Sequence, residues 1–131
     1  MALDEDIRQL ATARNLGALS TILPDGQPQT HLMWVDADET HLLVNTELGR
    51  AKLRNVERDP RVTLTIWDAE NPYRYAEVRG HVDEVVGGQE AREHIDACSY
   101  RYRDAPYPPE AIRTERVILR ITPDRIVRRK L

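Results

Sequence analysis

The sequence predicts a β-rich α+β protein, a small antiparallel β-barrel of six to seven strands with two to three peripheral helices. Short apolar stretches alternate with turn residues along most of the chain, which is typical of strands joined by tight turns. Other stretches place their apolar residues at helical spacing. A closed sheet removes the exposed edges that many short strands would otherwise present. The length of 131 residues fits one domain with one core, so we treat residues 1–131 as a single unit.

The first third of the chain is predicted to form one helix and three strands. Leu3, Ile7 and Leu10 recur at helical spacing, and acidic residues crowd the first turn, where the helix dipole favours them. Pro24 and Gly26 carry turn chemistry, since proline fixes φ and glycine accepts a positive φ. The expected elements are a helix within residues 3–14 and antiparallel strands at 16–23, 30–37 and 41–47.

The remainder of the chain is predicted to alternate helices with longer strands. A helix of two to three turns follows the third strand and ends at Asp59, because the residue before Pro60 avoids helical geometry. A strand comes next, and Gly80 marks a bulge or bend in the one after it. The expected elements are strands at 61–68 and 73–86, a helix at 88–103, a surface connection at 104–112, and two short strands around a Thr-Pro-Asp turn within 116–131.

Composition and charge exclude several classes of function. The net charge is −3, from 19 basic and 22 acidic residues, and this argues against a general nucleic-acid binder, which needs a cationic surface. Cys98 is the only cysteine, so an internal disulfide and a cysteine-rich zinc site are excluded; we predict that it is a buried residue without a chemical role. No leader and no apolar run of about 20 residues is evident, so we expect a cytoplasmic protein without a membrane span.

Hydrolytic and metal chemistry are not indicated by the motifs. Ser20 and Ser99 lack the strand-turn-helix context of a nucleophilic serine, and the glycine pair at 87–88 lacks a dinucleotide fingerprint. The four histidines do not fall in a metal-ligand spacing, so no metal is expected; they stand at positions 31, 41, 81 and 94. We therefore predict that a bound cofactor supplies the chemistry.

A cluster of cations follows the third predicted strand, in the stretch "VNTELGRAKLRNVERDPRV". Arg50, Lys52 and Arg54 stand at the start of the predicted helix, directly after Gly49. A helix N-terminus carries unpaired N–H groups and partial positive charge, so it binds phosphate or carboxylate groups readily. Arg50 adds a planar fork and Lys52 a mobile point charge, which suit a phosphate group. A solvated surface helix is an equally good interpretation of the residues alone.

Four stretches give the chain a family resemblance. They are "LGALSTILPDGQPQTHLMWV", "LLVNTELGRAKLRNVERDPRVTLTI", "WDAENPYRYAEVRGHV" and "RVILRITPDRIV", and together they cover most of the chain. In this order they resemble the split-barrel flavin-binding superfamily of pyridoxamine 5'-phosphate oxidase-like proteins, in particular its deazaflavin-dependent reductase branch using coenzyme F420. The resemblance implies a split barrel in which the triplet Arg50, Ala51 and Lys52 contacts the cofactor phosphate. Arg54 is expected to point to another part of the helix surface.

The resemblance also implies further residues of the cofactor cleft. The first group, on the second and third predicted strands, consists of His31, Met33, Trp34, Asn45 and Thr46. Alternation puts His31 and Met33 on one strand face and Trp34 on the other, so only one set can line the barrel interior. The alternative for His31 is a hydrogen-bonded structural histidine. The alternative for Met33 and Trp34 is ordinary core packing.

A second group of residues is expected near the cofactor bound mainly by the other subunit. Trp67 and Tyr73 flank a loop that reaches it by resemblance, with core or dimer packing as the alternative. Arg74 and Arg79, with Arg54, would meet an anionic tail, unless they are solvated strand cations. Tyr73 and His31 are candidate proton donors beside solvent. The small core, with no Phe, also favours a homodimer with its sites at the interface.

Three functions fit these residues. The first is an F420-dependent oxidoreductase that passes a hydride between the deazaflavin and a small conjugated or planar organic substrate. The second places FMN in the same cleft, although the chain ends "RIVRRKL" without the Arg-Leu-x-Pro motif of the vitamin oxidases. The third is a non-catalytic protein that binds or stores a flavin, a deazaflavin or haem. The partners expected are a small-molecule substrate and a second copy of the chain, with no nucleic acid.

Overall fold

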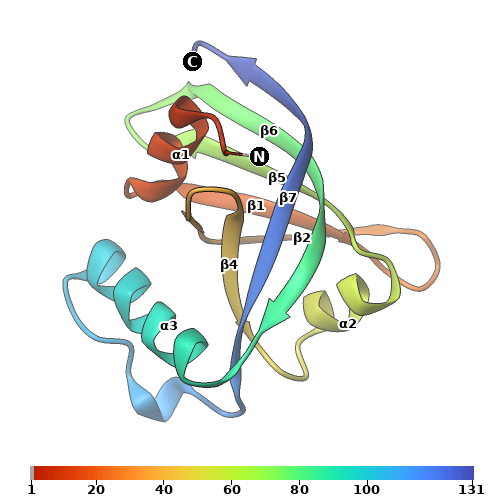
Figure 1. Ribbon diagram of the computed structural model, residues 1–131, viewed down its shortest axis with the longest axis vertical. Coiled ribbons are helices and arrows are strands. Elements are labelled where there is room, and N and C mark those ends of the chain that lie inside the picture. Colours follow the sequence, from red (N-terminus) through yellow and green to blue (C-terminus); the bar gives the residue numbers. More distant parts are fainter. Residues whose placement is uncertain (1) are drawn as a thin grey trace.

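A computed structural model describes residues 2–131 as one seven-stranded antiparallel sheet, curled into a half-barrel, with three α-helices around it (Figure 1). This confirms the small split β-barrel that the sequence predicts. The strand order is β2-β1-β5-β6-β7-β4-β3. The elements are α1 (Glu5–Thr12), β1 (Leu16–Ile22), β2 (Pro28–Trp34), β3 (Asp36–Ala37), β4 (Leu42–Glu47), α2 (Ala51–Arg58), β5 (Arg61–Asp68), β6 (Asn71–Val86), α3 (Gly88–Arg103), a 3₁₀ turn η1 (Pro109–Ala111) and β7 (Arg116–Arg129).

The core lies inside the curled sheet. Along β1 and β5 every second side chain is buried, as alternation requires, so Leu19, Leu64 and Ile66 face inward. Helix α1 closes one end of the barrel by burying Ile7 and Leu10 against this core. Helices α2 and α3 also lie where helices are predicted, so all three are confirmed. No helix within residues 2–131 is long and apolar enough to cross a membrane.

The strands β6 and β7 run side by side along most of their length and carry the curl of the sheet (Figure 1). The pairing slips between Arg79 and Gly80, which confirms the bulge predicted at this glycine. A side chain at Gly80 would overlap the carbonyl oxygen of Thr122 on β7, so the close approach of the two strands requires glycine here.

The prediction of two short strands within 116–131 is wrong, because β7 is one continuous strand. The Thr-Pro-Asp sequence does not turn the chain. Pro123 lies opposite Gly80, at the slip in the β6–β7 pairing, where the ladder is already irregular. A proline without an N–H is tolerated at such a place, so the strand continues past it.

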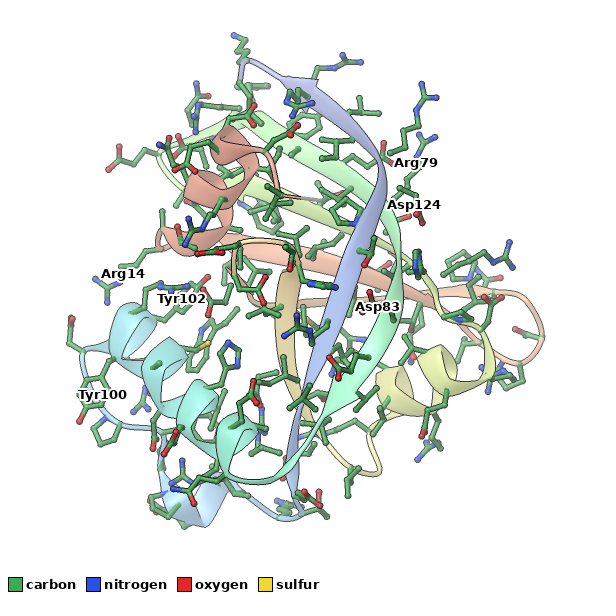
Figure 2. All side chains as sticks on the ribbon, viewed as in Figure 1. Arg14, Arg79, Asp83, Tyr100, Tyr102 and Asp124 are labelled. Atoms are coloured by element: carbon green, nitrogen blue, oxygen red, sulfur yellow. The ribbon has the colours of Figure 1, made fainter. Side chains whose placement is uncertain are left out.

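The predicted strand at 30–37 is broken at Val35, which changes how the first strands pair. The buried Val35 donates its N–H to the hydroxyl of Tyr102, at 3.2 Å, instead of to a neighbouring strand. Tyr102 reaches the sheet from the end of α3 (Figure 2). Hydrogen-bonded pairing passes from β1–β2 before the break to β3–β4 after it. The three strands are thus no simple meander, and β2 approaches β4 without pairing to it, which leaves the barrel split.

The Gly80 contact yields a stability prediction. Gly80→Ala should lower the free energy of unfolding by about 1 to 3 kcal/mol, because the new methyl group forces β6 and β7 apart. Urea denaturation followed by circular dichroism measures this. Arg79→Ala, exposed on the same strand, is the control and should stay within about 0.5 kcal/mol of the wild type. Equal midpoints for Gly80→Ala and the wild type would show that the strands do not touch here.

Candidate functional site

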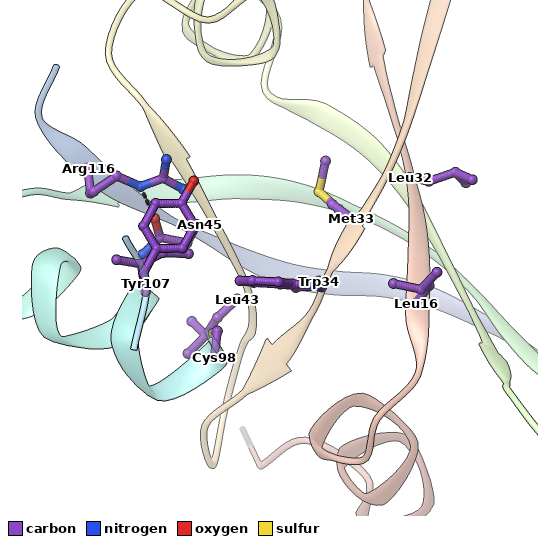
Figure 3. Close-up of a pocket in the computed structure, with 10 residues that line it drawn as sticks. Leu16, Leu32, Met33, Trp34, Leu43, Asn45, Cys98, Tyr107 and Arg116 are labelled. Atoms are coloured by element: carbon purple, nitrogen blue, oxygen red, sulfur yellow. Dashed lines mark hydrogen bonds between the residues drawn. The ribbon is translucent and has the colours of Figure 1, made fainter. Parts of the chain in front are cut away.

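A cavity of about 330 Å³ lies where the barrel is split, between β2, β4, α3 and the start of β7 (Figure 3). Its wall is mostly apolar, with a few polar groups at one end, as is usual for small-molecule sites. The residues that line it are Leu16, Leu32, Met33, Trp34, Leu43, Asn45, Ile95, Cys98, Tyr107 and Arg116.

Aromatic rings give the cavity a flat wall. The indole of Trp34 stacks on the ring of Tyr102, with centroids 5.2 Å apart and planes 5° from parallel. Tyr107 meets Trp34 edge-on, at 6.2 Å. Stacked and edge-on contacts of this kind hold the rings in place. The exposed side of Trp34 is therefore a fixed, planar surface against which a conjugated ring can lie.

A buried ion pair forms the polar end of the cavity. Arg116 lies 3.4 Å from Glu47, and its guanidinium stands over the ring of Tyr107, at 5.2 Å. Glu47 also accepts the N–H groups of Arg113 and Thr114, at 2.7 and 3.0 Å. Burial raises the pKa of Glu47, but these hydrogen bonds and the one from Arg50 outweigh it, and the pKa lies below its usual value. The carboxylate is therefore charged and holds Arg116 in place.

Asn45 connects the ion pair to α3. Its side-chain oxygen accepts the Nε–H of Arg116, at 2.8 Å, and its nitrogen donates to the carbonyl of Ala91, at 3.0 Å. Asn45 thus lines the cavity, but its side chain is already engaged with the protein. The main effect of Asn45 is therefore to hold Arg116 in position.

The N-terminus of α2 carries positive charge that the protein does not neutralise fully. Arg50 is the N-cap residue and pairs with Glu47, at 3.3 Å, whereas Lys52 makes no ion pair within residues 2–131. Burial lowers the pKa of Lys52, and the charges of Arg50 and Arg116 lower it further. Burial also lowers the pKa of His31, and Lys52 and Arg50 add to the effect. The smaller part of each shift comes from repulsion among these cations, and an anion bound between them would relieve that repulsion.

The Nδ1 atom of His31 supports the same conclusion. It is buried and has no hydrogen-bond partner among the residues that the structure describes. Buried polar atoms in folded proteins nearly always have a partner, so an orphan atom indicates a missing ligand or water. With Lys52 and Arg50 beside it, the residues present fit a phosphate group.

The structure thus brings together two of the predicted groups of residues. Met33, Trp34 and Asn45 line the cavity. His31, Arg50 and Lys52 gather at the start of α2 and do not line it, but Glu47 links Arg50 to Arg116 at the polar end of the cavity. Of Met33 and Trp34, only Met33 packs against the barrel core, as alternation predicts, yet both border the cavity because β2 ends there. Two other candidates have less access: Thr46 is buried in β4 and does not line the cavity, and Ala51 is half-buried in the first turn of α2.

The second predicted group lies elsewhere in the protomer. Trp67, Tyr73 and Arg74 stand at the β5–β6 hairpin and do not line the cavity. Tyr73 is 74% exposed, and Arg74 pairs with Asp68, at 3.4 Å.

Two expected tail-binding cations also have partners within the protein. The Nη1 of Arg54 donates to the carbonyl of Gly49 at 2.6 Å, and Arg79 pairs with Glu77 at 3.1 Å. Arg54, Arg74 and Arg79 could therefore contact a ligand in the cavity only if a partner subunit presented them or if their present contacts were broken.

Sequence reasoning missed Arg116, Tyr107 and Glu47. Arg116 and Tyr107 come from the last third of the chain, and no local motif marks them; only the pairing of β7 with β4 brings Arg116 beside Asn45 and Glu47. Glu47 stands just before the predicted cations in the sequence, but no local pattern shows that it is buried. Cys98 is buried, as predicted, but it borders the cavity.

Comparison with known proteins assigns the family. The family model described as pyridoxamine 5'-phosphate oxidase matches residues 3–129. The chain belongs to this family. Among solved structures, an F420 reductase is 33% identical, with a TM-score of 0.82, and the match covers 95% of this chain and 98% of that one.

Two further structures of the same fold extend the comparison. A conserved hypothetical protein from Mycobacterium tuberculosis is 28% identical, with a TM-score of 0.75, and the match covers 98% of this chain and 86% of the other. The General Stress Protein 26 from Bacillus anthracis shares the fold at 22% identity, with a TM-score of 0.71 and coverage of 95% and 92%. The family's fold thus extends over nearly the whole chain.

His31 gives the cleft a predictable pH dependence. Its lowered pKa leaves the ring neutral at neutral pH, and a bound phosphate favours the protonated ring. The affinity for a phosphate-bearing flavin or deazaflavin should therefore rise as the pH falls from neutral to mildly acidic values. Fluorescence titrations of the wild type and of His31→Asn measure this, because the ligand's own titration is common to both.

The rise should be smaller in His31→Asn than in the wild type. His81→Asn, which changes an exposed histidine paired with Asp124, should keep the full dependence. Parallel pH profiles for the wild type and His31→Asn would show that His31 does not contact the phosphate of such a ligand.

Proposed function

We propose that the protein is an F420-dependent oxidoreductase that transfers a hydride between the deazaflavin and a small conjugated or planar organic substrate. The observation that carries this proposal is the joining of two sites: a cluster of cations with an orphan histidine atom, and an aromatic-walled cavity beside it. The 33% identity to an F420 reductase over nearly the whole of both chains supports the choice of cofactor.

The proposed binding mode follows from the order of these groups along the cleft. Lys52, Arg50 and the His31 Nδ1–H hold the phosphate at the N-terminus of α2, where backbone N–H groups add to their charge. The planar ring system lies in the cavity against Trp34, and Leu43 and Met33 exclude water from it. When bound, the deazaflavin supplies the hydride, and the protein supplies orientation and a dry site.

The roles of the two candidate proton donors differ in this proposal. His31 is assigned to phosphate binding, because its neighbours are the cations of the cleft and its pKa is lowered. Tyr73 is too exposed and too far along the β5–β6 hairpin to act in the cavity of its own protomer. It serves only if a partner subunit presents it; otherwise solvent supplies the proton.

A homodimer is part of the proposal. The outer face of β1, β2 and β5 carries exposed apolar groups: Leu32 is 67% and Leu16 39% exposed, and Trp67 alternates with the buried Ile66. Leu16 and Leu32 also form one rim of the cavity, so a second copy on this face would close it. A symmetric pair then carries two equivalent sites. We place this dimer in the cytoplasm, since nothing in the chain calls for an oxidising compartment.

FMN is the second candidate for the same cleft. Its phosphate would meet the same three donors, and its ring the same wall of Trp34. We therefore expect FMN to bind, but more weakly than coenzyme F420. A protein that only stores such a cofactor would bind it equally well and show no turnover with enones or quinones.

Lys52 gives the experiment that tests this proposal. Fluorescence titration should show tighter binding of coenzyme F420 than of FMN, and Lys52→Ala should weaken the binding of either. The loss should be roughly 1.5 to 3 kcal/mol, or about tenfold to a hundredfold, because the contact to phosphate is charge-assisted. The loss should shrink as the salt concentration rises.

The chain has one other lysine, which provides the matched control. Lys130 lies after the end of β7 and is exposed, so Lys130→Ala removes the same charge and should bind as the wild type does. Tighter binding of FMN would overturn the choice of cofactor. Equal affinities for Lys52→Ala and Lys130→Ala would overturn the phosphate site.

The dimer can be tested by a charge placed on its proposed interface. Leu32→Asp should convert a dimer into a monomer in sedimentation velocity and weaken cofactor binding, because a carboxylate would be buried there. Tyr100→Asp, which changes an exposed residue on the outer side of α3, should remain dimeric (Figure 2). A monomeric wild type at micromolar concentration would refute this part of the proposal.

A further inference from the structure

Three side chains of types that bind metal ions lie close together beside the cavity, although they come from two distant segments of the chain. His94 and Cys98 stand four residues apart on α3, on the same face of the helix, and Asp36 comes from β3. The Nε2 atom of His94 lies 2.9 Å from Oδ2 of Asp36 and 3.5 Å from Sγ of Cys98. All three donor atoms lie within 4.8 Å of one another.

The surroundings of this trio resemble those of a metal site. The Asp36 and His94 side chains are only 14% and 11% exposed, and Cys98 is 3% exposed. Arg101 donates to the other carboxylate oxygen of Asp36, at 2.8 Å, and so aims Oδ2 at His94. Outer partners of this kind orient the ligands of known metal sites.

We propose that Asp36, His94 and Cys98 form a site for a divalent ion of the Zn²⁺ class. Tetrahedral zinc binds sulfur at about 2.3 Å and nitrogen or oxygen at about 2.0–2.2 Å, which places its ligand atoms roughly 3.3–3.6 Å apart. The distances from His94 to Asp36 and to Cys98, 2.9 and 3.5 Å, are close to this spacing, and small side-chain movements would bring all three atoms onto one ion. A thiolate and an imidazole select a borderline-soft ion over Mg²⁺ or Ca²⁺. Three protein ligands leave a fourth position open for a water molecule or another ligand. Of the three, Cys98 also borders the cavity.

Metal binding at this place competes with protons. The Nε2 atom of His94 is hydrogen-bonded to Asp36 at 2.9 Å, and the ion would have to replace the proton of that bond. The thiol must also lose its proton to become a ligand. The ion should therefore bind more tightly as the pH rises and should release protons on binding.

The proposed site is connected to the cofactor cleft through Asn45. The Nδ1 atom of His94 lies 3.0 Å from the amide nitrogen of Asn45, whose oxygen holds Arg116. Asn45 therefore lies between the proposed metal site and the polar end of the cavity, in contact with His94 on one side and Arg116 on the other.

Cobalt(II) provides the direct test, because a bound thiolate gives it an intense charge-transfer band in the near ultraviolet. Chelator-treated protein without cofactor should bind one Co²⁺ with this band, and Zn²⁺ should displace it. Cys98→Ser should abolish the band. His94→Gln and Asp36→Asn should weaken Zn²⁺ binding by about tenfold or more, since even the loss of an outer partner costs ~10–100-fold.

The chain offers a matched control at a second His–Asp contact. His41 lies 2.9 Å from Asp83, with no cysteine in its cluster, so His41→Gln should leave the band and the Zn²⁺ affinity unchanged. Thermal melts establish that each variant is folded. The proposal is overturned if Co²⁺ gives no thiolate band, or if His94→Gln binds metal as the wild type does. Either result leaves the cofactor proposal intact, because no flavin is present.

Discussion

The buried carboxylate of Glu47 is the contact on which the candidate site depends. It ties together three segments that are distant in the chain: the end of β4, the backbone at Arg113 and Thr114, and the N-cap of α2 at Arg50. It also balances the charge of Arg116, which would otherwise stand unpaired in a mostly apolar cavity. Because its pKa is lowered, it contributes stability at neutral pH that is lost as the pH falls through that lowered pKa.

The distribution of charge explains how an acidic chain can attract an anion. The net charge is −3, and many of the cations along the strands have carboxylate partners close by. At the start of α2 the balance is reversed, because Glu47 is shared between Arg50 and Arg116 while Lys52 has no acidic partner within residues 2–131. The Nδ1 atom of His31, which has no hydrogen-bond partner among residues 2–131, is exposed to the positive charges of Lys52 and Arg50. The excess of positive charge is therefore confined to the start of α2, which is where we propose that the phosphate binds.

The sequence could predict what local patterns determine. Alternation, turn residues and helical spacing predicted the strands, the three helices and the bulge at Gly80. These patterns failed at Val35 and at Pro123, where contacts with distant residues determine the backbone. Val35 bonds to the hydroxyl of Tyr102 instead of to a neighbouring strand, and the long pairing with β6 keeps β7 continuous past Pro123. The same limit applies to the site. The cations of α2 are local, whereas Arg116 reaches the cleft only through strand pairing across the sheet.

A crystal structure of the protein with coenzyme F420 tests the central claim most directly. The account predicts phosphate oxygens within hydrogen-bonding distance of Lys52 Nζ and His31 Nδ1, and the deazaflavin ring against Trp34. A phosphate held elsewhere, for example between Arg14 and Arg74 beside α1, would contradict it. So would a ring that lies outside the cavity between β2 and α3.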